Sequence, residues 1–170
     1  MANKNKTENS LHPLANAEEA VKPLKAKYNL KVVQRKTSEY GEELTLQNAV
    51  AGVRIRHSLR DGKGLLVVVG RLDEGRFPPH PGPRHQGADL TRFDLRDIAS
   101  LRMDRISESL QNKLRTDAPI DGEDVAKLLN HCCADILSGH FSIFDAASRI
   151  VKSRAERLAR EYPRKNSSPQ

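Results

Sequence analysis

Alternating arginines in the segment GVRIRHSLR have the spacing in this sequence that most directly suggests a chemical role. Arg54 and Arg56 alternate with the apolar Val53 and Ile55, and Arg60 follows four residues after Arg56. Because successive side chains of a strand point to opposite faces, this spacing predicts a row of guanidinium groups on one face of a sheet. Such a row can contact phosphates without reading a sequence, or carboxylates on another protein. A solvated surface without a partner is the third interpretation.

Neighbouring charges decide how far this row extends. Lys31 and Arg35 add to it if the register of their strand permits, whereas Glu39, Glu42 or Glu43 can pair with it inside the fold. The sequence leaves these alternatives open. Sheets that recognise RNA bases stack them on aromatic side chains, and the predicted strands here contain none. The pattern therefore argues against base recognition.

A proline-rich segment, EGRFPPHPGPRH, follows the arginine row. Its PPHP stretch at 78–81 has the PxxP spacing of SH3 ligands, but the flanking basic residue is missing, because Arg76 is too close and position 83 is proline. Prolines restrict the conformations of a long loop, so we expect a stiff connector. Arg76, Phe77 and Arg84 combine an aromatic with basic side chains and make the loop a candidate interaction edge.

Histidines and cysteines give weaker signals for a metal or a nucleophile. His80 and His85 lie in the proline-rich segment, where their spacing does not force several ligands to converge. Cys132 and Cys133 continue an apolar helical stripe, and the preceding His131 faces away from Cys132. The chain contains no G-x-S-x-G, P-loop, G-x-G-x-x-G, H-E-x-x-H or C-x-x-C motif. We therefore predict no catalytic residue, no cofactor and no metal site.

Charge and composition narrow the kinds of partner. The chain has 170 residues and a net charge of +7, and most of the excess lies in the first 72 residues. A basic half favours an acidic protein, an anionic surface or nucleic acid as partner. The amino terminus has no apolar signal region, and no apolar run reaches the roughly 18–20 residues of a membrane span. With only two adjacent cysteines, we expect a cytoplasmic protein that does not enter a membrane.

Several segments of the first half have the apolar patterning of β-strands. They are residues 30–36, 43–50, 52–59 and 65–72. Asp61-Gly62 is typical of a tight hairpin turn between the last two. Since proline cannot continue a ladder, we expect the sheet to end near Leu72. The first half thus predicts an antiparallel sheet of three to four strands.

The second half has helical periodicity. The predicted helices cover residues 93–115, 117–139 and 142–162. Asp94, Asp121 and Ser142 are their candidate N-caps, with Asp145 completing a capping box, and Gly139 fits the end of the second helix. The apolar stripe of the first helix rotates, which predicts a bend near residue 102.

A shorter helix is predicted near the amino terminus. Asn16 can cap it, with Glu19 three positions further on, and Pro23 would shorten or bend it.

A sheet followed by helices indicates an α+β fold. We expect one domain over residues 16–162, in which two to three C-terminal helices cover the apolar face of the sheet. The proline-rich connector spans 73–92, and residues 1–15 and 163–170 are predicted to be disordered.

Two segments resemble small uncharacterised bacterial proteins. They are YNLKVVQRKTSEYGEELTLQNAVAGVRIRH, followed by DGKG, and ADILSGHFSIFDAASRIVKSRAERLAREY. Several of these proteins look like immunity proteins, so the resemblance implies a protein that binds and blocks a toxin made by the same cell. The basic sheet differs from the acidic surface expected of a nuclease inhibitor. The resemblance assigns no site residues.

The sequence therefore predicts a non-enzymatic protein-binding module, such as a toxin-neutralising or adaptor protein. The alternative is a basic protein that binds nucleic acid through its phosphates. The candidate binding residues are Arg54, Arg56, Arg60, Arg76, Phe77 and Arg84.

Overall fold

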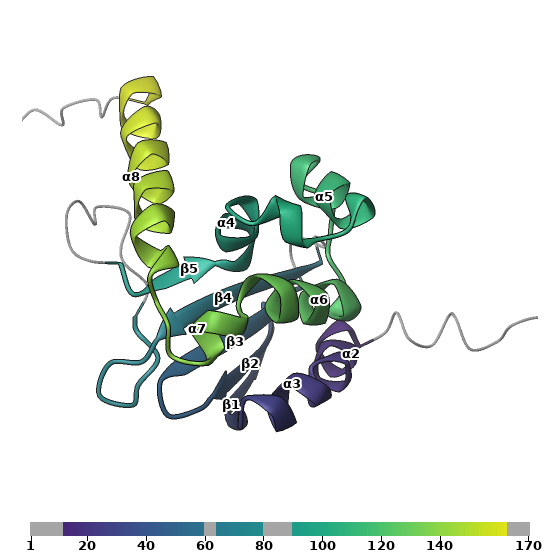
Figure 1. Ribbon diagram of the computed structural model, residues 1–170. Coiled ribbons are helices and arrows are strands. Elements are labelled where there is room, and N and C mark those ends of the chain that lie inside the picture. The colour runs from purple at the N-terminus through teal and green to yellow at the C-terminus, as the bar shows by residue number, and fades with distance from the viewer. Residues whose placement is uncertain (1–11, 60–63, 80–89, 163–170) are drawn as a thin grey trace, which may run out of the picture.

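The computed structural model describes residues 12–59, 64–79 and 90–162 (Figure 1). Its elements, in chain order, are α2 (Pro13–Ala20), α3 (Lys22–Lys27), β1 (Lys31–Ser38), β2 (Gly41–Gln47), β3 (Ala51–Ser58), β4 (Leu65–Arg71), β5 (Arg92–Asp94), α4 (Leu95–Ser100), the 3-10 helix η1 (Met103–Arg105), α5 (Glu108–Arg115), α6 (Gly122–Cys132), α7 (Ala134–Leu137) and α8 (Ile143–Glu161). These elements form an α+β fold, as expected from their order. The predicted disorder of the two ends falls largely outside the described residues, although α2 already begins at Pro13.

The sheet is antiparallel, and its five strands are in the order β1-β2-β3-β4-β5. The expected three to four strands are therefore too few. The chain returns to the sheet after the proline-rich segment, and β5 pairs with β4 through Val69 with Phe93 and Gly70 with Arg92. The expectation that the sheet ends near Leu72 was wrong because a strand of three residues is too short to show periodicity.

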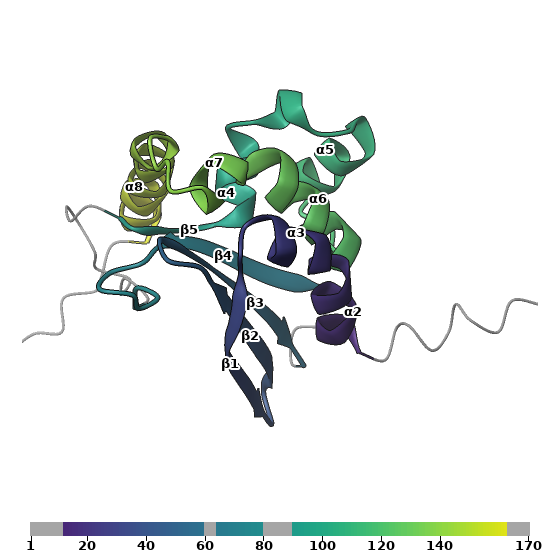
Figure 2. The ribbon, with the colours of Figure 1, turned by 60° about the horizontal axis from the view of Figure 1, so that its bottom comes forward.

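One face of the sheet forms the floor of the hydrophobic core. The side chains on it are buried and alternate along the central strands: Leu44, Leu46, Val53, Ile55, Val67 and Val69. Helices α2, α4, α6 and α7 pack on this face (Figure 2). The N-terminal α2 thus joins the expected C-terminal helices in the cover. A Cβ atom on Gly122 would lie 2.6 Å from Cα of Ala17, so α2 and α6 approach each other closely at this glycine.

The helix ends agree in part with the predicted caps. Asp94 accepts a hydrogen bond from the backbone N–H of Arg96, and Asp121 forms a capping box with Asp124. The helix predicted over 93–115 is interrupted after Ser100, as the rotated stripe indicated. Its first two residues lie instead in β5.

Two predicted caps are wrong. Ser142 has helical backbone angles and makes no side-chain capping bond. Asn16 lies inside α2, which begins after His12 because Pro13 suits the first turn of a helix. The predicted break near Pro23 is present as the boundary between α2 and α3.

The longest helix, α8, extends away from the rest of the fold (Figure 1). Phe144 and Ala147 near its start are buried, whereas every residue from Lys152 to Tyr162 is exposed. Across the described ranges, none of the helices combines the length and the apolar character needed to cross a membrane.

Candidate functional site

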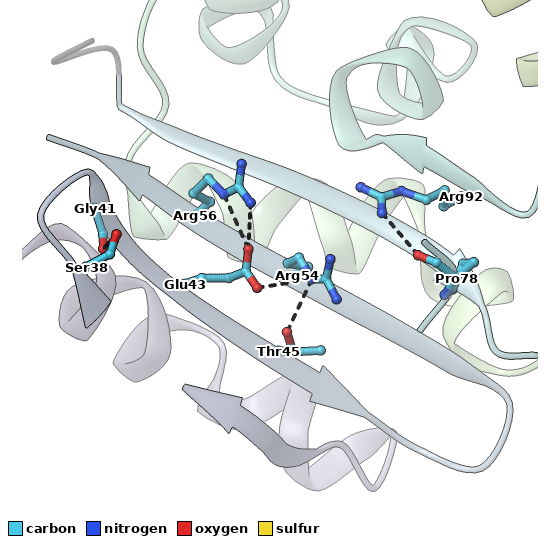
Figure 3. A network of polar contacts seen from close by, with 8 residues as sticks. All are labelled: Ser38, Gly41, Glu43, Thr45, Arg54, Arg56, Pro78 and Arg92. Carbon is cyan, nitrogen blue, oxygen red and sulfur yellow. Dashed lines mark hydrogen bonds and ion pairs between the residues drawn. The ribbon is translucent and has the colours of Figure 1, made fainter. Parts of the chain in front are cut away.

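The face of the sheet opposite the helices carries two arginines of the predicted row, Arg54 and Arg56. We call it the arginine face and define it by Arg54, Arg56, Arg92, Glu43 and Thr45 (Figure 3). Alternation along β3 places Arg54 and Arg56 here, while Val53 and Ile55 point into the core. The predicted division of β3 into a basic and an apolar side is confirmed.

Glu43 lies between two of these arginines. Nη2 of Arg56 donates to Oε2 of Glu43 at 2.9 Å, and Nε of Arg54 lies 3.5 Å from Oε1 of the same carboxylate. Arg54 also donates to Oγ1 of Thr45 at 3.4 Å. These contacts follow from the register, because Glu43 is opposite Arg56 and Thr45 is opposite Arg54. Among the described residues, Glu43 is the carboxylate that pairs with the row.

The start of the proline-rich segment packs onto the same face. A Cβ atom on Gly52 would lie 2.5 Å from Cδ2 of Phe77, so the aromatic ring occupies the space that this glycine leaves. The guanidinium carbon of Arg54 lies 4.5 Å from the centre of the Phe77 ring, and that of Arg92 lies 5.5 Å from it. Arg92 also donates from Nη1 to the carbonyl of Pro78 at 3.1 Å. Phe77 therefore holds the connector on the sheet and supports two arginines.

Arg92 is a member of the arginine face that sequence reasoning missed. It comes after the proline-rich segment, and β5 brings it opposite Gly70 of β4. Burial, together with repulsion from Arg54 and Arg56, lowers the pKa of Arg92. A three-residue strand gave no sequence signal that could have placed Arg92 here.

The residue by which β1 extends the arginine face differs from the one that the sequence suggested. A bulge between Val32 and Gln34 shifts the register, so Arg35 lies opposite the core residue Leu44. Arg35 therefore points to the helix side, where it donates to Glu18 at 2.6 Å. The register therefore does not permit Arg35 to extend the row, and Lys36, opposite Glu43, takes that place.

Lys31 does share the side of the arginine face, because it lies opposite Gln47, two residues from Thr45 in β2.

An open hollow of about 360 Å³ lies where the arginine face reaches the β1–β2 turn. Its lining residues are Lys36, Ser38, Tyr40, Gly41, Glu42, Glu43, Arg56, Ser58 and Leu66. Gly41 contributes no side chain there, and its φ of +150° combined with the nearby His57 carbonyl prevents substitution. Ser38 and Gly41 lie at this end of the face, near Arg56 and Glu43 (Figure 3).

The other candidate residues are not all part of this face. Arg76 is exposed in a turn, where its backbone pairs with that of Asp73. Arg60, Arg84, His80 and His85 lie outside the described residues.

The cysteines pack as predicted. Cys132 and Cys133 are both free and fully buried. Burial raises the pKa of Cys132 to about 11, so the thiol stays protonated at neutral pH. Within the ranges the structure describes, no group of His, Cys, Asp and Glu is arranged to hold a metal ion.

A search of protein-family models, curated proteins and solved structures finds no match to this chain. The resemblance to small bacterial proteins therefore stays a prediction.

Proposed function

We propose that this protein is a non-enzymatic binding module that holds an acidic surface of a partner protein on its arginine face. One observation carries the proposal: of the three arginines on the face opposite the helices, Arg54 and Arg56 share the carboxylate of Glu43, and Arg92 donates to the backbone carbonyl of Pro78. Among the described residues, the arginines of this face outnumber the carboxylates that pair with them, so the face has excess positive charge. Guanidinium groups match carboxylates in a fixed two-pronged geometry, which gives such a face selectivity for acidic side chains.

The details of the face favour a protein over nucleic acid. Glu43 sits between Arg54 and Arg56, where its charge opposes the approach of a phosphate chain. Phe77 packs against Gly52 with Arg54 beside its ring, so it is not presented for base stacking. A protein surface can place a neutral hydrogen-bond donor beside Glu43 and carboxylates beside the arginines. The phosphates of nucleic acid are all negatively charged and offer no neutral donor beside Glu43.

Nucleic-acid binding through phosphates is the second candidate. It is supported by the grouping of Arg54, Arg56 and Arg92 on one open surface. Such binding weakens steeply with salt because counterions are released from the phosphates. A complex that keeps its affinity at high salt after nuclease treatment excludes this candidate.

Neutralisation of a toxin is a narrower form of the proposal. It is supported by the resemblance of the two sequence segments to immunity-like proteins. It predicts that the captured partner is toxic to cells that lack this protein and harmless to cells that make it. Growth of cells that express the partner with and without this protein measures the effect.

The proposal is tested by removing the central charges together. The variant Glu43→Gln/Arg54→Gln/Arg56→Gln removes the carboxylate together with the two arginines that contact it. No buried charge is then left unpaired. Lys127→Gln is the control, because it changes the net charge equally at an exposed position of α6. Each tagged protein is used to capture partners from lysate treated with nuclease, and recovered proteins are quantified.

We expect a protein captured in equal amount by the wild type and the Lys127→Gln control. The triple variant should recover at least about tenfold less of it, which corresponds to about 1.4 kcal/mol of binding free energy. Equal recovery by the triple variant contradicts the proposal. Recovery of nucleic acid alone, lost as salt rises, replaces it with the second candidate.

A further inference from the structure

The β1 strand is an open edge of the sheet. Among the described residues, β2 pairs with one side of β1 and no strand pairs with the other. Its residues are almost all exposed, unlike those of β2 and β3. The opposite edge is the short β5, which leads directly into α4. An edge strand offers backbone N–H and C=O groups to an added strand.

We propose that the outer edge of β1, from Gln34 to Ser38, takes an extended acidic segment of the partner protein as a sixth strand. This inference rests on the proposed function, which it deepens by giving the conformation and charge of the bound segment. Main-chain hydrogen bonds supply affinity in such strand addition, and side chains supply specificity.

The geometry of β1 supports a docking site of this length. The bulge between Val32 and Gln34 interrupts its start, but from Gln34 to Ser38 the pairing with β2 is regular. These five residues correspond to a strand of typical length. A partner segment can therefore pair with the regular part without meeting the bulge.

The charges of β1 select the occupant. The strand, KVVQRKTS, contains Lys31, Arg35 and Lys36 and no carboxylate; Arg35 is already paired with Glu18 of α2, so the two lysines are the charges that an added strand would meet. Lysines on an edge strand oppose unselective pairing, so an acidic strand is favoured over a neutral one. Pairing with a second copy of this chain would bring two cationic strands together, which is unfavourable. The charge therefore fits an acidic segment of another protein.

The edge continues into the arginine face. Lys36 is opposite Glu43, Glu43 is opposite Arg56, and Arg56 is opposite Leu66, so these four residues form one row across the sheet. Leu66 is 45% exposed at the far end of this row. A strand added beside Lys36 extends the same row by one residue. The partner can thus contact the edge and the arginine face as one continuous surface.

Two fluorescein-labelled peptides test the inference with the full chain. The first is a short peptide of alternating Glu and Val. The second has the same sequence with N-methyl groups on two successive central residues, which removes a backbone donor from each edge of the peptide and leaves its charge unchanged. Binding is measured by fluorescence anisotropy, and exchange of the β1 amides is measured by mass spectrometry.

We expect the unmodified peptide to bind and to slow amide exchange in residues 34–38. N-methylation should weaken binding up to about tenfold, because one of the two methyl groups removes the donor on the edge that faces β1 and blocks that hydrogen bond. Lys36→Gln should weaken it by about threefold, whereas Lys127→Gln, exposed on α6, should leave it unchanged.

Equal binding of the two peptides overturns the added strand. It leaves the proposed function standing if the triple variant of the arginine face still loses its partner. Absence of binding by both peptides also overturns the inference. Failure of the proposed function has a different result, in which the wild type and the triple variant capture the partner equally.

Discussion

Two groups of arginines in this protein are used in different ways. Arg102, between α4 and η1, donates to both carboxylate oxygens of Asp135 at 2.6 and 2.5 Å and to the carbonyl of Cys132 at 2.5 Å. On the arginine face, Arg54 and Arg56 share the carboxylate of Glu43. The side chain of Arg102 is 9% exposed, whereas that of Arg56 is 58% exposed.

The difference separates a structural arginine from one available to a partner. Arg102 has each end of its fork paired inside the fold, and it ties the end of α4 to α6 and α7. Arg56 has one partner and an exposed side chain on the face that no helix covers. Residue type alone does not distinguish the two groups, because both are arginines next to carboxylates. The comparison predicts that the first group governs stability and the second governs binding.

Arg102→Ala should have the largest effect on stability. It leaves Asp135 and the Cys132 carbonyl without their guanidinium partner, and loss of one member of such a pair costs about 3 kcal/mol of unfolding free energy. Urea denaturation measures this change. Arg105→Ala, at an exposed neighbouring position, should stay within about 0.5 kcal/mol of the wild type. A loss no larger than that of this control contradicts the structural role of Arg102.

Gly52→Ala should have the next largest effect. Its Cβ atom would meet the Phe77 ring at 2.5 Å, so the variant should lose about 2 kcal/mol through overpacking. In a Phe77→Ala background the same change should cost much less, because the clashing ring is absent. A double-mutant cycle by urea denaturation measures this coupling. Equal costs in the two backgrounds would show that Phe77 does not rest on Gly52.

Acid should weaken the Arg102–Asp135 pair by a smaller amount. The hydrogen bond from Arg102 lowers the pKa of Asp135 below 3.8. A carboxyl whose pKa is lowered by folding contributes its full stability above the unfolded value and loses it as pH falls through the folded value. Asp135→Asn should therefore show less loss of stability than the wild type as pH falls below 3.8. Parallel curves from urea denaturation over this range would contradict the expectation.

Arg56→Gln should have the smallest effect on stability. The side chain is largely exposed and Arg54 remains beside Glu43, so the unfolding free energy should change by less than about 1 kcal/mol. The same variant should still reduce capture of the acidic partner. A change as large as that of Arg102→Ala would place Arg56 with the structural arginines and remove the distinction.

Local sequence signals predicted the parts of the fold that depend on local physics. The alternation along 52–59 identified both sides of β3, and Asp94 and Asp121 cap helices as expected. Gly139, with a φ of +92°, follows the end of α7, where a left-handed residue favours glycine. The internal pairing of the arginine row was among the alternatives left open, and the register selects Glu43.

Features that depend on long-range pairing were not predictable. The bulge in β1 exchanges the sides of Arg35 and Lys36, and nothing in the alternation of residues reveals where an extra residue is inserted. Arg92 joins the face only because β5 returns to β4 after the proline-rich segment. Such contacts join residues far apart in the chain, so a pattern within one segment does not contain them.

The most direct test of the central claim compares the two groups of arginines in one titration. The side-chain Nε–H signals of the arginines are followed by NMR while oligoglutamate is added as an acidic probe. We expect the signals of Arg54, Arg56 and Arg92 to shift together and saturate, while that of Arg102 stays in place. The prediction is contradicted if the signal of the exposed Arg115 shifts as much as those of the arginine face. It is also contradicted if no signal of the arginine face shifts.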